Sequence, residues 1–232
     1  MKRFYKDVSV EALDGGYQVQ LDGRVVKTPG KETLSMPTEA LADAVAEEWR
    51  KQGEKIDTES MPLTRLANTV LDRVSPRFEA VANDIAAFGG TDLLCYRAVD
   101  QDELEAKQAA TWNPYLEWAE DRLGAKLVVT SGIMPVAQDK GALDQLAAEV
   151  DAFDAYELTA LHEFTNGFGS LVLALAYMKN FKDFEACWQA SILDQTHQEE
   201  LWGVDYEAED KRALLLRDLK ATCDFLSHLR NK

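Results

Sequence analysis

Apolar and polar residues alternate near the N-terminus, and this period of two restricts the fold more than any other feature of the sequence. Tyr17, Val19 and Leu21 alternate with glutamines, which is the pattern of a strand with one buried face. Asp-Gly pairs follow Leu13 and Leu21, and such pairs favour the type I′ turns that join antiparallel strands. The segment therefore predicts two hairpins and one further short strand. The predicted strands cover residues 4–13, 17–21, 24–28 and 33–36.

Beyond these strands the apolar spacing changes to three and four residues, which predicts helices. Thr38 is placed to cap the first helix, and Met61-Pro62 opens the second. Gly89-Gly90 should end the third helix, with Thr91 as the next candidate cap. Asn113-Pro114 should split or kink the helix that contains it. The other predicted elements are helices over residues 78–88, 104–123, 143–153, 157–178, 184–202 and 206–229 and one isolated strand over residues 126–130.

This order of elements predicts an α+β fold. A small N-terminal β-rich mixed domain is expected over residues 1–75, and a larger, mainly helical domain over residues 76–232. The chain has 232 residues, of which 46% are hydrophobic, so it can bury an ordinary core. No apolar run approaches the roughly 20 residues that span a bilayer, so membrane insertion is not expected. The net charge of −16 would repel phosphate backbones, so we expect no nucleic acid partner.

The cysteines and the N-terminal segment favour a bacterial cytoplasm. Cys95, Cys187 and Cys223 are few, odd in number and far apart in the sequence, which suits a reducing compartment. The first residues, MKRFYKDV, lack the apolar core of a signal peptide and the Arg- and Ser-rich pattern of a transit peptide. We therefore expect a cytoplasmic, bacterial protein.

Patterns typical of catalysis are incomplete in this chain. His162-Glu163 lacks the second histidine of an HExxH zinc motif. The glycines of Gly167–Ser170 lack the lysine of a phosphate-binding loop, and close helix packing is the expected reason for them. We therefore expect no catalytic residues and no metal site. One alternative stays open, an acidic metal-dependent hydrolase that uses His162, His197 and nearby carboxylates.

An acidic segment over residues 195–209, QTHQEELWGVDYEAE, is the strongest candidate for a binding surface. Its carboxylates surround Trp202 and Gly203 without any catalytic arrangement, which favours a surface that another protein recognises. The alternative is a solvated acidic helix end whose Trp202 packs into the core, because runs of charge are usually solvent-exposed.

Seven short segments, in a fixed order along nearly the whole chain, are more specific together than any one alone. They are RFYKDV, LDGRVVKTP, LADAVAEEWRKQ, MPLTRLANTVLDRV, TDLLCYRA, QAATWNPYLEWA and EELWGVDYEAE. Together they resemble the ATP12 family, the assembly chaperones of the F-type ATP synthase found in mitochondria and alphaproteobacteria. These chaperones act on the alpha subunit of the catalytic head.

The resemblance implies a function and a set of contact residues. It implies a small mixed N-terminal domain, a larger helical domain, no catalysis and no cofactor. The implied function is to bind the unassembled alpha subunit and to promote assembly of the alpha/beta hexamer. A general holdase with no dedicated client is the other alternative that stays open. The acidic, WG-containing segment of the family corresponds here to residues 194–205. The expected partner-binding residues are Asp194, Glu199, Glu200, Trp202 and Asp205.

Overall fold

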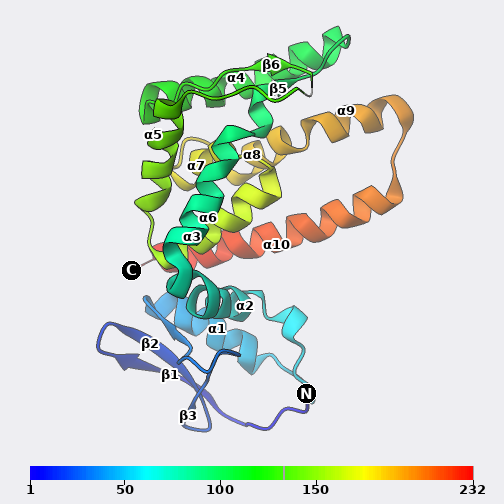
Figure 1. Ribbon diagram of the computed structural model, residues 1–232. Coiled ribbons are helices and arrows are strands. Elements are labelled where there is room, and N and C mark those ends of the chain that lie inside the picture. The colour runs from blue at the N-terminus through cyan, green and yellow to red at the C-terminus, as the bar shows by residue number, and fades with distance from the viewer. Residues whose placement is uncertain (133, 232) are drawn as a thin grey trace. The chain divides into compact units, whose positions relative to one another are not determined.

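The computed structural model describes residues 1–132 and 134–231, and it confirms the α+β class (Figure 1). The chain forms two compact units. The first contains residues 1–78, residues 155–160 and the chain from Leu216 onward, and the second contains residues 79–154 and 161–215. The first unit therefore includes the predicted N-terminal domain, residues 1–75, together with two later segments. Whether residues 1–75 and 76–232 fold as separate domains stays a prediction.

Four short strands form an antiparallel sheet in the first unit (Figure 1). Strand β2 pairs with each of the other three strands. Asp22 and Gly23 have φ angles of 50° and 74°, and a type I′ turn requires positive φ at both positions. The predicted hairpins are confirmed, although the first, third and fourth strands are shorter than the sequence pattern predicts. The strands are β1 (Val8–Leu13), β2 (Gly16–Leu21), β3 (Arg24–Val25) and β4 (Ser35–Met36).

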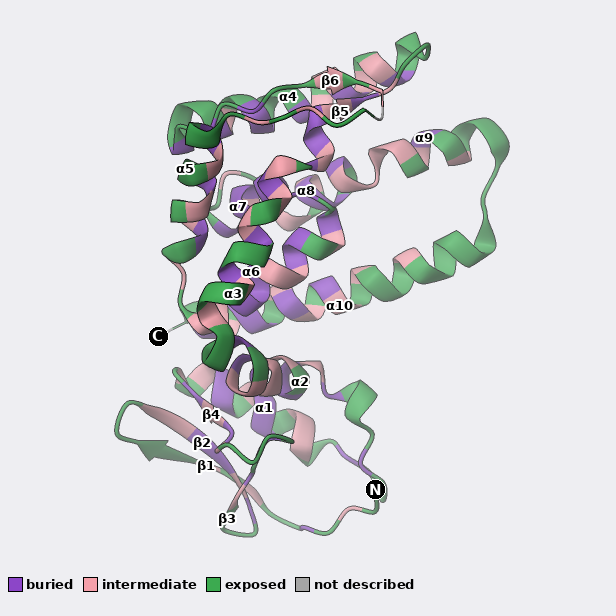
Figure 2. Ribbon diagram, in the orientation of Figure 1, coloured by how far each residue is buried: buried purple, intermediate pink, exposed green. Residues whose placement is uncertain are grey.

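Helix α1 (Glu39–Arg50) packs on β1 and β2 and forms the core of the first unit with them. Thr38 caps α1 as predicted, because its side-chain oxygen accepts a hydrogen bond from the N–H of Leu41 at 3.3 Å. Leu41 and Val45 are fully buried, as is Val19 on β2 (Figure 2). Helix α2 (Pro62–Thr69) begins with the predicted proline. A π-helical turn at Val70–Val74 and a 3-10 turn at Ser75–Arg77 follow it.

The later segments of the first unit are hydrogen-bonded to its N-terminal part. They belong to α6 (Ala155–Phe168) and to α10 (Tyr206–Arg230). The Thr38 hydroxyl donates a hydrogen bond to the carbonyl of His228 at 2.9 Å, and the Tyr156 hydroxyl donates one to the carbonyl of Ser35. These bonds join residues that lie more than a hundred positions apart in the sequence.

The second unit is mainly helical, and its core surrounds α7. Every residue of α7 except Tyr177 is buried. Trp112 and Phe164 are also fully buried in this unit. The two strands β5 and β6 pair in parallel. Besides parts of α6 and α10, the elements are α3 (Phe78–Ala87), β5 (Tyr96–Arg97), α4 (Asp102–Leu123), β6 (Thr130–Ser131), α5 (Lys140–Asp151), α7 (Leu171–Met178), α8 (Phe184–Ser191) and α9 (Leu193–Trp202).

Two predictions about α4 and its surroundings need correction. Asn113-Pro114 does not split α4, which continues through Pro114 as one helix, whereas a kink there stays a prediction. Trp112 and Tyr115 on either side are both buried, so their packing compensates for the hydrogen bond that proline cannot make. The strand predicted near residues 126–130 is found at Thr130–Ser131, and it is not isolated, because it pairs with β5.

Three helix boundaries also differ from the predictions. Gly169 has a φ angle of 66° and ends α6, and the Ser170 oxygen accepts a hydrogen bond from the N–H of Leu173 to cap α7. Gly169 therefore belongs to a helix break and not to a close helix contact, because no atom lies within 4 Å of an added Cβ. Gly167 lies inside α6, and close packing there stays a prediction. Ile192 separates α8 from α9, where one helix was predicted. Asp92, and not Thr91, is the cap that follows the third helix, since its carboxylate accepts the N–H of Leu94 at 3.1 Å.

Candidate functional site

Helices α9 and α10 meet at a sharp turn in the second unit, which we call the elbow, residues 201–206. Gly203 ends α9 with φ of 86° and ψ of 170°, a conformation that favours glycine. Its N–H donates to the carbonyl of Glu199 at 2.9 Å. Asp205 then begins α10, because its carboxylate accepts the N–H groups of Glu207 and Ala208 at 3.0 and 3.3 Å. The sequence WGVDY therefore encodes a helix stop followed at once by a helix start.

The elbow exposes large apolar side chains. Trp202 is 80% exposed and Tyr206 is 78% exposed, whereas Trp112 in the same unit is fully buried. The interpretation of Trp202 as a core residue is therefore wrong. Large exposed apolar groups that lie together are typical of surfaces that contact another molecule. The other exposed apolar residues nearby are Leu201, Val204, Leu214 and Leu215.

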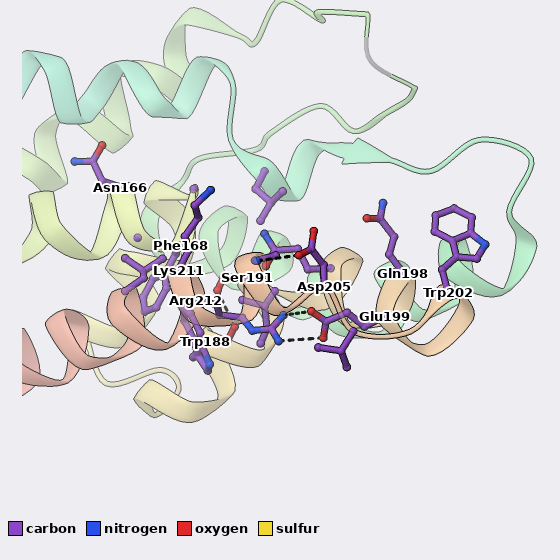
Figure 3. A pocket seen from close by; sticks show the side chains of 18 of the residues that line it. Asn166, Phe168, Trp188, Ser191, Gln198, Glu199, Trp202, Asp205, Lys211 and Arg212 are labelled. Atoms are coloured by element: carbon purple, nitrogen blue, oxygen red, sulfur yellow. Dashed lines mark hydrogen bonds and ion pairs between the residues drawn. The ribbon is translucent and has the colours of Figure 1, made fainter.

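A hollow of about 860 Å³ lies between α9 and the first turns of α10 (Figure 3). We call it the α9–α10 groove. Phe168 and Trp188 are almost completely buried and line it, together with Ile192. Trp202, Val204 and Leu215 add exposed apolar surface to its lining. Figure 3 shows Trp202 at one end of the groove and Asn166 at the other.

An ion pair joins α9 to α10 across the groove. The Arg212 guanidinium donates to both carboxylate oxygens of Glu199, at 2.6 and 3.0 Å, and each side chain is only 20% exposed (Figure 3). The hydrogen bonds from Arg212 to Glu199 raise the pKa of the guanidinium further above its ordinary value. A two-pronged contact of this kind fixes orientation as well as charge, so it holds the two helices in register.

Asp194 and Glu200 contact α4 rather than the groove. Gln108 of α4 is 1% exposed, and its side-chain amide donates to Asp194 at 2.7 Å. Lys107 of α4 donates to Glu200 at 2.9 Å. This hydrogen bond lowers the pKa of the Glu200 carboxyl and raises the pKa of Lys107, and the two directions agree. Both carboxylates therefore tie α9 to α4.

Comparison with known proteins identifies the family. The model of the ATP12 chaperone protein family matches residues 2–120. The chain belongs to the ATP12 chaperone family. The crystal structure of Atp12 from Paracoccus denitrificans is 43% identical, covers 99% of this chain and 98% of its own, and superposes with a TM-score of 0.95. The Atu1473 protein from Agrobacterium tumefaciens is 38% identical, with 99% and 86% of the two chains covered and a TM-score of 0.93.

A relative of lower sequence identity agrees with this assignment. Protein atp12, mitochondrial, from Schizosaccharomyces pombe is 24% identical over 94% of this chain and 78% of its own length. The ATP12 family predicted from the seven sequence segments is therefore confirmed. Within the described residues no helix is both long and apolar enough to cross a membrane.

In this ATP12 family member, the five predicted partner-binding residues occupy different environments. Glu199, Trp202 and Asp205 line the α9–α10 groove, whereas Asp194 and Glu200 face α4. The sequence interpretation missed Phe168, Trp188, Ile192, Val204 and Leu215, which also line the groove. Val204 could have been predicted from the sequence, because it directly follows the Trp202-Gly203 pair that ends α9.

The two histidines of the hydrolase alternative, His162 and His197, lie beside other side chains. The ring of His162 lies 3.4 Å from Glu163 and 3.1 Å from the side-chain amide of Asn166. His197 is buried, and its Nδ1 atom lies 3.3 Å from Nζ of Lys107. Across residues 1–132 and 134–231, no three His, Cys, Asp or Glu side chains are grouped closely enough to hold a metal ion. No observation in the described part of the chain therefore favours this alternative.

Proposed function

We propose that this protein is a molecular chaperone that binds the unassembled alpha subunit of the F-type ATP synthase and promotes assembly of the alpha/beta hexamer. Membership of the ATP12 chaperone family carries this proposal. On this proposal the protein is not an enzyme and needs no cofactor. It acts in a bacterial cytoplasm, where its partner is a protein and not a nucleic acid, a membrane or a small molecule.

The exposed groove at α9–α10 has the properties that such a function requires. A chaperone must cover apolar surface on its client without outcompeting the subunit that finally replaces it. Apolar contact area with a polar rim provides adhesion, and rim charges act mainly on the rate of association. Trp202 and Val204 offer apolar area in the groove, and the carboxylates of Glu199 and Asp205, which are hydrogen-bonded within the unit, lie beside them. We therefore propose the groove as the client-binding site.

The proposal is tested with purified components. Isolated alpha subunit is mixed with the chaperone, and complex formation is measured by size-exclusion chromatography and by suppression of alpha-subunit aggregation. Beta subunit is then added. We expect a stoichiometric complex that releases the alpha subunit into an alpha/beta assembly.

Two controls separate the alternatives. Equal protection of an unrelated, chemically unfolded protein would identify a general holdase. Hydrolytic activity that depends on stoichiometric bound zinc and disappears in His162→Ala would identify the hydrolase. Absence of any complex with the alpha subunit would refute the proposal.

A further inference from the structure

Along residues 194–210 the charged side chains are all acidic, although the lining of the groove also includes Lys211 and Arg212. Between Asp194 and Asp210 the sequence has seven carboxylates and no lysine or arginine. The nearest basic residues that follow are Lys211 and Arg212. Arg212 is engaged by Glu199, and Lys211 donates to Glu207 at 2.7 Å. The seven carboxylates are Asp194, Glu199, Glu200, Asp205, Glu207, Glu209 and Asp210.

The seven carboxylates differ in whether they already form hydrogen bonds or ion pairs within the protein. Asp194, Glu199 and Glu200 are hydrogen-bonded within the unit, and Asp205 caps α10. By contrast, Glu209 and Asp210 are exposed, and neither side chain forms an ion pair or a hydrogen bond with another described residue. Glu207 is exposed too, and its pair with Lys211 is open to solvent. These three carboxylates lie outside the lining of the groove, next in sequence to Ala208 and Lys211, which line it. They are the ones that can meet charges of a partner beside the groove.

We propose that the α9–α10 groove binds a protein segment that carries apolar side chains flanked by lysine or arginine. The apolar side chains would cover Trp202, Val204 and Leu215 and reach toward Trp188 at the bottom of the groove. The flanking basic groups would meet Glu207, Glu209 and Asp210. This inference rests on the proposed function, because it specifies which chemistry of a client the chaperone recognises.

Electrostatics distinguishes this occupant from a second copy of the chain. A symmetric dimer through the elbow would place the same acidic surface on both sides of the interface. Each copy has a net charge of −16, so the two elbows would repel one another unless they were neutralised. A basic segment gains attraction from the same field, and juxtaposed like charges select against the wrong partner.

The test uses fluorescently labelled peptides of about four helical turns, or roughly 14 residues. One peptide combines leucine with lysine on an amphipathic pattern, a second replaces every lysine by glutamate, and a third keeps lysine but replaces leucine by serine. Binding to the full-length protein is measured by fluorescence anisotropy. We expect the leucine–lysine peptide to bind about tenfold more tightly than either of the other two. Equal binding of the glutamate peptide would overturn the proposal.

Protein variants test which residues make the contact. Trp202→Ala should weaken binding of the leucine–lysine peptide about tenfold or more, because exposed aromatic residues are common hot spots. Phe4→Ala is the matched control, since Phe4 is a 64% exposed aromatic residue of the other unit. Thermal melting shows that both variants are folded. Wild-type affinity in Trp202→Ala would overturn the proposal.

The charge contribution has its own matched pair of variants. Glu207→Gln, Glu209→Gln and Asp210→Asn, combined, should slow association and weaken its dependence on salt. Asp43→Asn, Asp84→Asn and Asp121→Asn remove the same number of exposed charges elsewhere, and should leave the association rate nearly unchanged. Equal slowing in both triple variants would show that only net charge matters, which would overturn the local contact.

The same variants separate this inference from the proposed function. If wild type and Trp202→Ala bind isolated alpha subunit equally, the groove inference fails and the proposed function stands. If the leucine–lysine peptide binds the groove but the alpha subunit does not bind the protein, the proposed function fails and the groove inference stands. A wild-type dimer in sedimentation that Trp202→Ala converts to a monomer would identify a second copy as the occupant and overturn the inference.

Discussion

The region around Trp112 and the elbow around Trp202 belong to the same unit but use their aromatic side chains in opposite ways. Trp112 is fully buried, and its ring nitrogen donates to the carbonyl of Ala190 at 2.8 Å. Trp202 is 80% exposed. The first arrangement stabilises the fold through packing and a satisfied buried donor. The second contributes little to folding and leaves apolar surface accessible to a partner.

The polar contacts of the two regions differ in the same direction. Near Trp112, the buried side chain of Gln108 joins α4 to α9, because its amide N–H donates to Asp194. Its amide oxygen also accepts the N–H of Ala98. At the elbow the contacts of Asp205 are local caps within α10. Buried side chains of α4 therefore stabilise this part of the unit, whereas the elbow is held in shape by its own turn and by the Glu199–Arg212 pair.

The largest expected effect on stability distinguishes the two tryptophans. Trp112→Ala should lower the free energy of unfolding by about 3–5 kcal/mol, because it leaves a large cavity. It also removes the donor to the Ala190 carbonyl. Trp202→Ala should change the free energy of unfolding by no more than about 0.5 kcal/mol. Urea unfolding followed by circular dichroism measures both. Similar midpoints for the two variants would contradict the assigned difference in burial.

A smaller effect is expected at the ion pair between α9 and α10. Glu199→Gln should lower the free energy of unfolding by about 1 kcal/mol, because a charge-assisted, two-pronged contact is replaced by a neutral one. Glu207→Gln is the control. It makes the same chemical change at an ion pair whose two side chains are 73% and 80% exposed, so its effect should stay within about 0.5 kcal/mol.

An equal effect of the two glutamate substitutions would contradict a structural role for the Glu199–Arg212 pair. If urea unfolding gives the same stability change for Glu199→Gln and Glu207→Gln, the Glu199–Arg212 pair is no more structural than an open surface pair. The elbow would then be held by its turn alone. Charge reversal at Glu199 is a poor probe of client binding, because the introduced lysine would lie against Arg212.

Local signals in the sequence were sufficient for much of the fold. The Asp22-Gly23 turn, the Thr38 cap and the proline that opens α2 were predicted correctly, because each depends on a few neighbouring residues. The break at Gly169 and the unsplit α4 were not predicted. In α4, the packing of buried residues beside Pro114 outweighs the local preference of proline to break a helix. Tertiary packing of this kind cannot be predicted from the adjacent residues in the sequence.

The environment of Trp202 was not predictable for a related reason. On one continuous helix, Trp188 and Trp202 are separated by two heptads and would share a face, which suggests that both are buried. The structure interrupts this helix at Ile192, between α8 and α9. Trp188 remains 3% exposed, while Trp202 is turned to solvent. The acidic segment was recognised from the sequence, but the partners of its carboxylates lie far away in the sequence, on α4 and α10.

The smallest expected effect concerns the tie between α4 and the exposed end of α9. Lys107 lowers the pKa of Glu200, so the favourable contribution of this pair is present above the ordinary glutamate pKa of about 4.3. It is lost as pH falls through the lowered pKa of the folded state, because protonation removes the charge. Lys107→Ala should therefore raise the pKa of Glu200 toward its ordinary value and leave the melting temperature at neutral pH nearly unchanged.

Carboxyl titration by NMR measures this pKa directly, with Lys126→Ala as a control. Lys126 is an exposed lysine that pairs with Glu120, so its removal should leave the titration of Glu200 in place. If Glu200 titrates identically in wild type and Lys107→Ala, the pair does not persist in solution. Residue 200 would then belong with the exposed carboxylates of α10, and the acidic surface available to a basic client would extend from α10 onto α9.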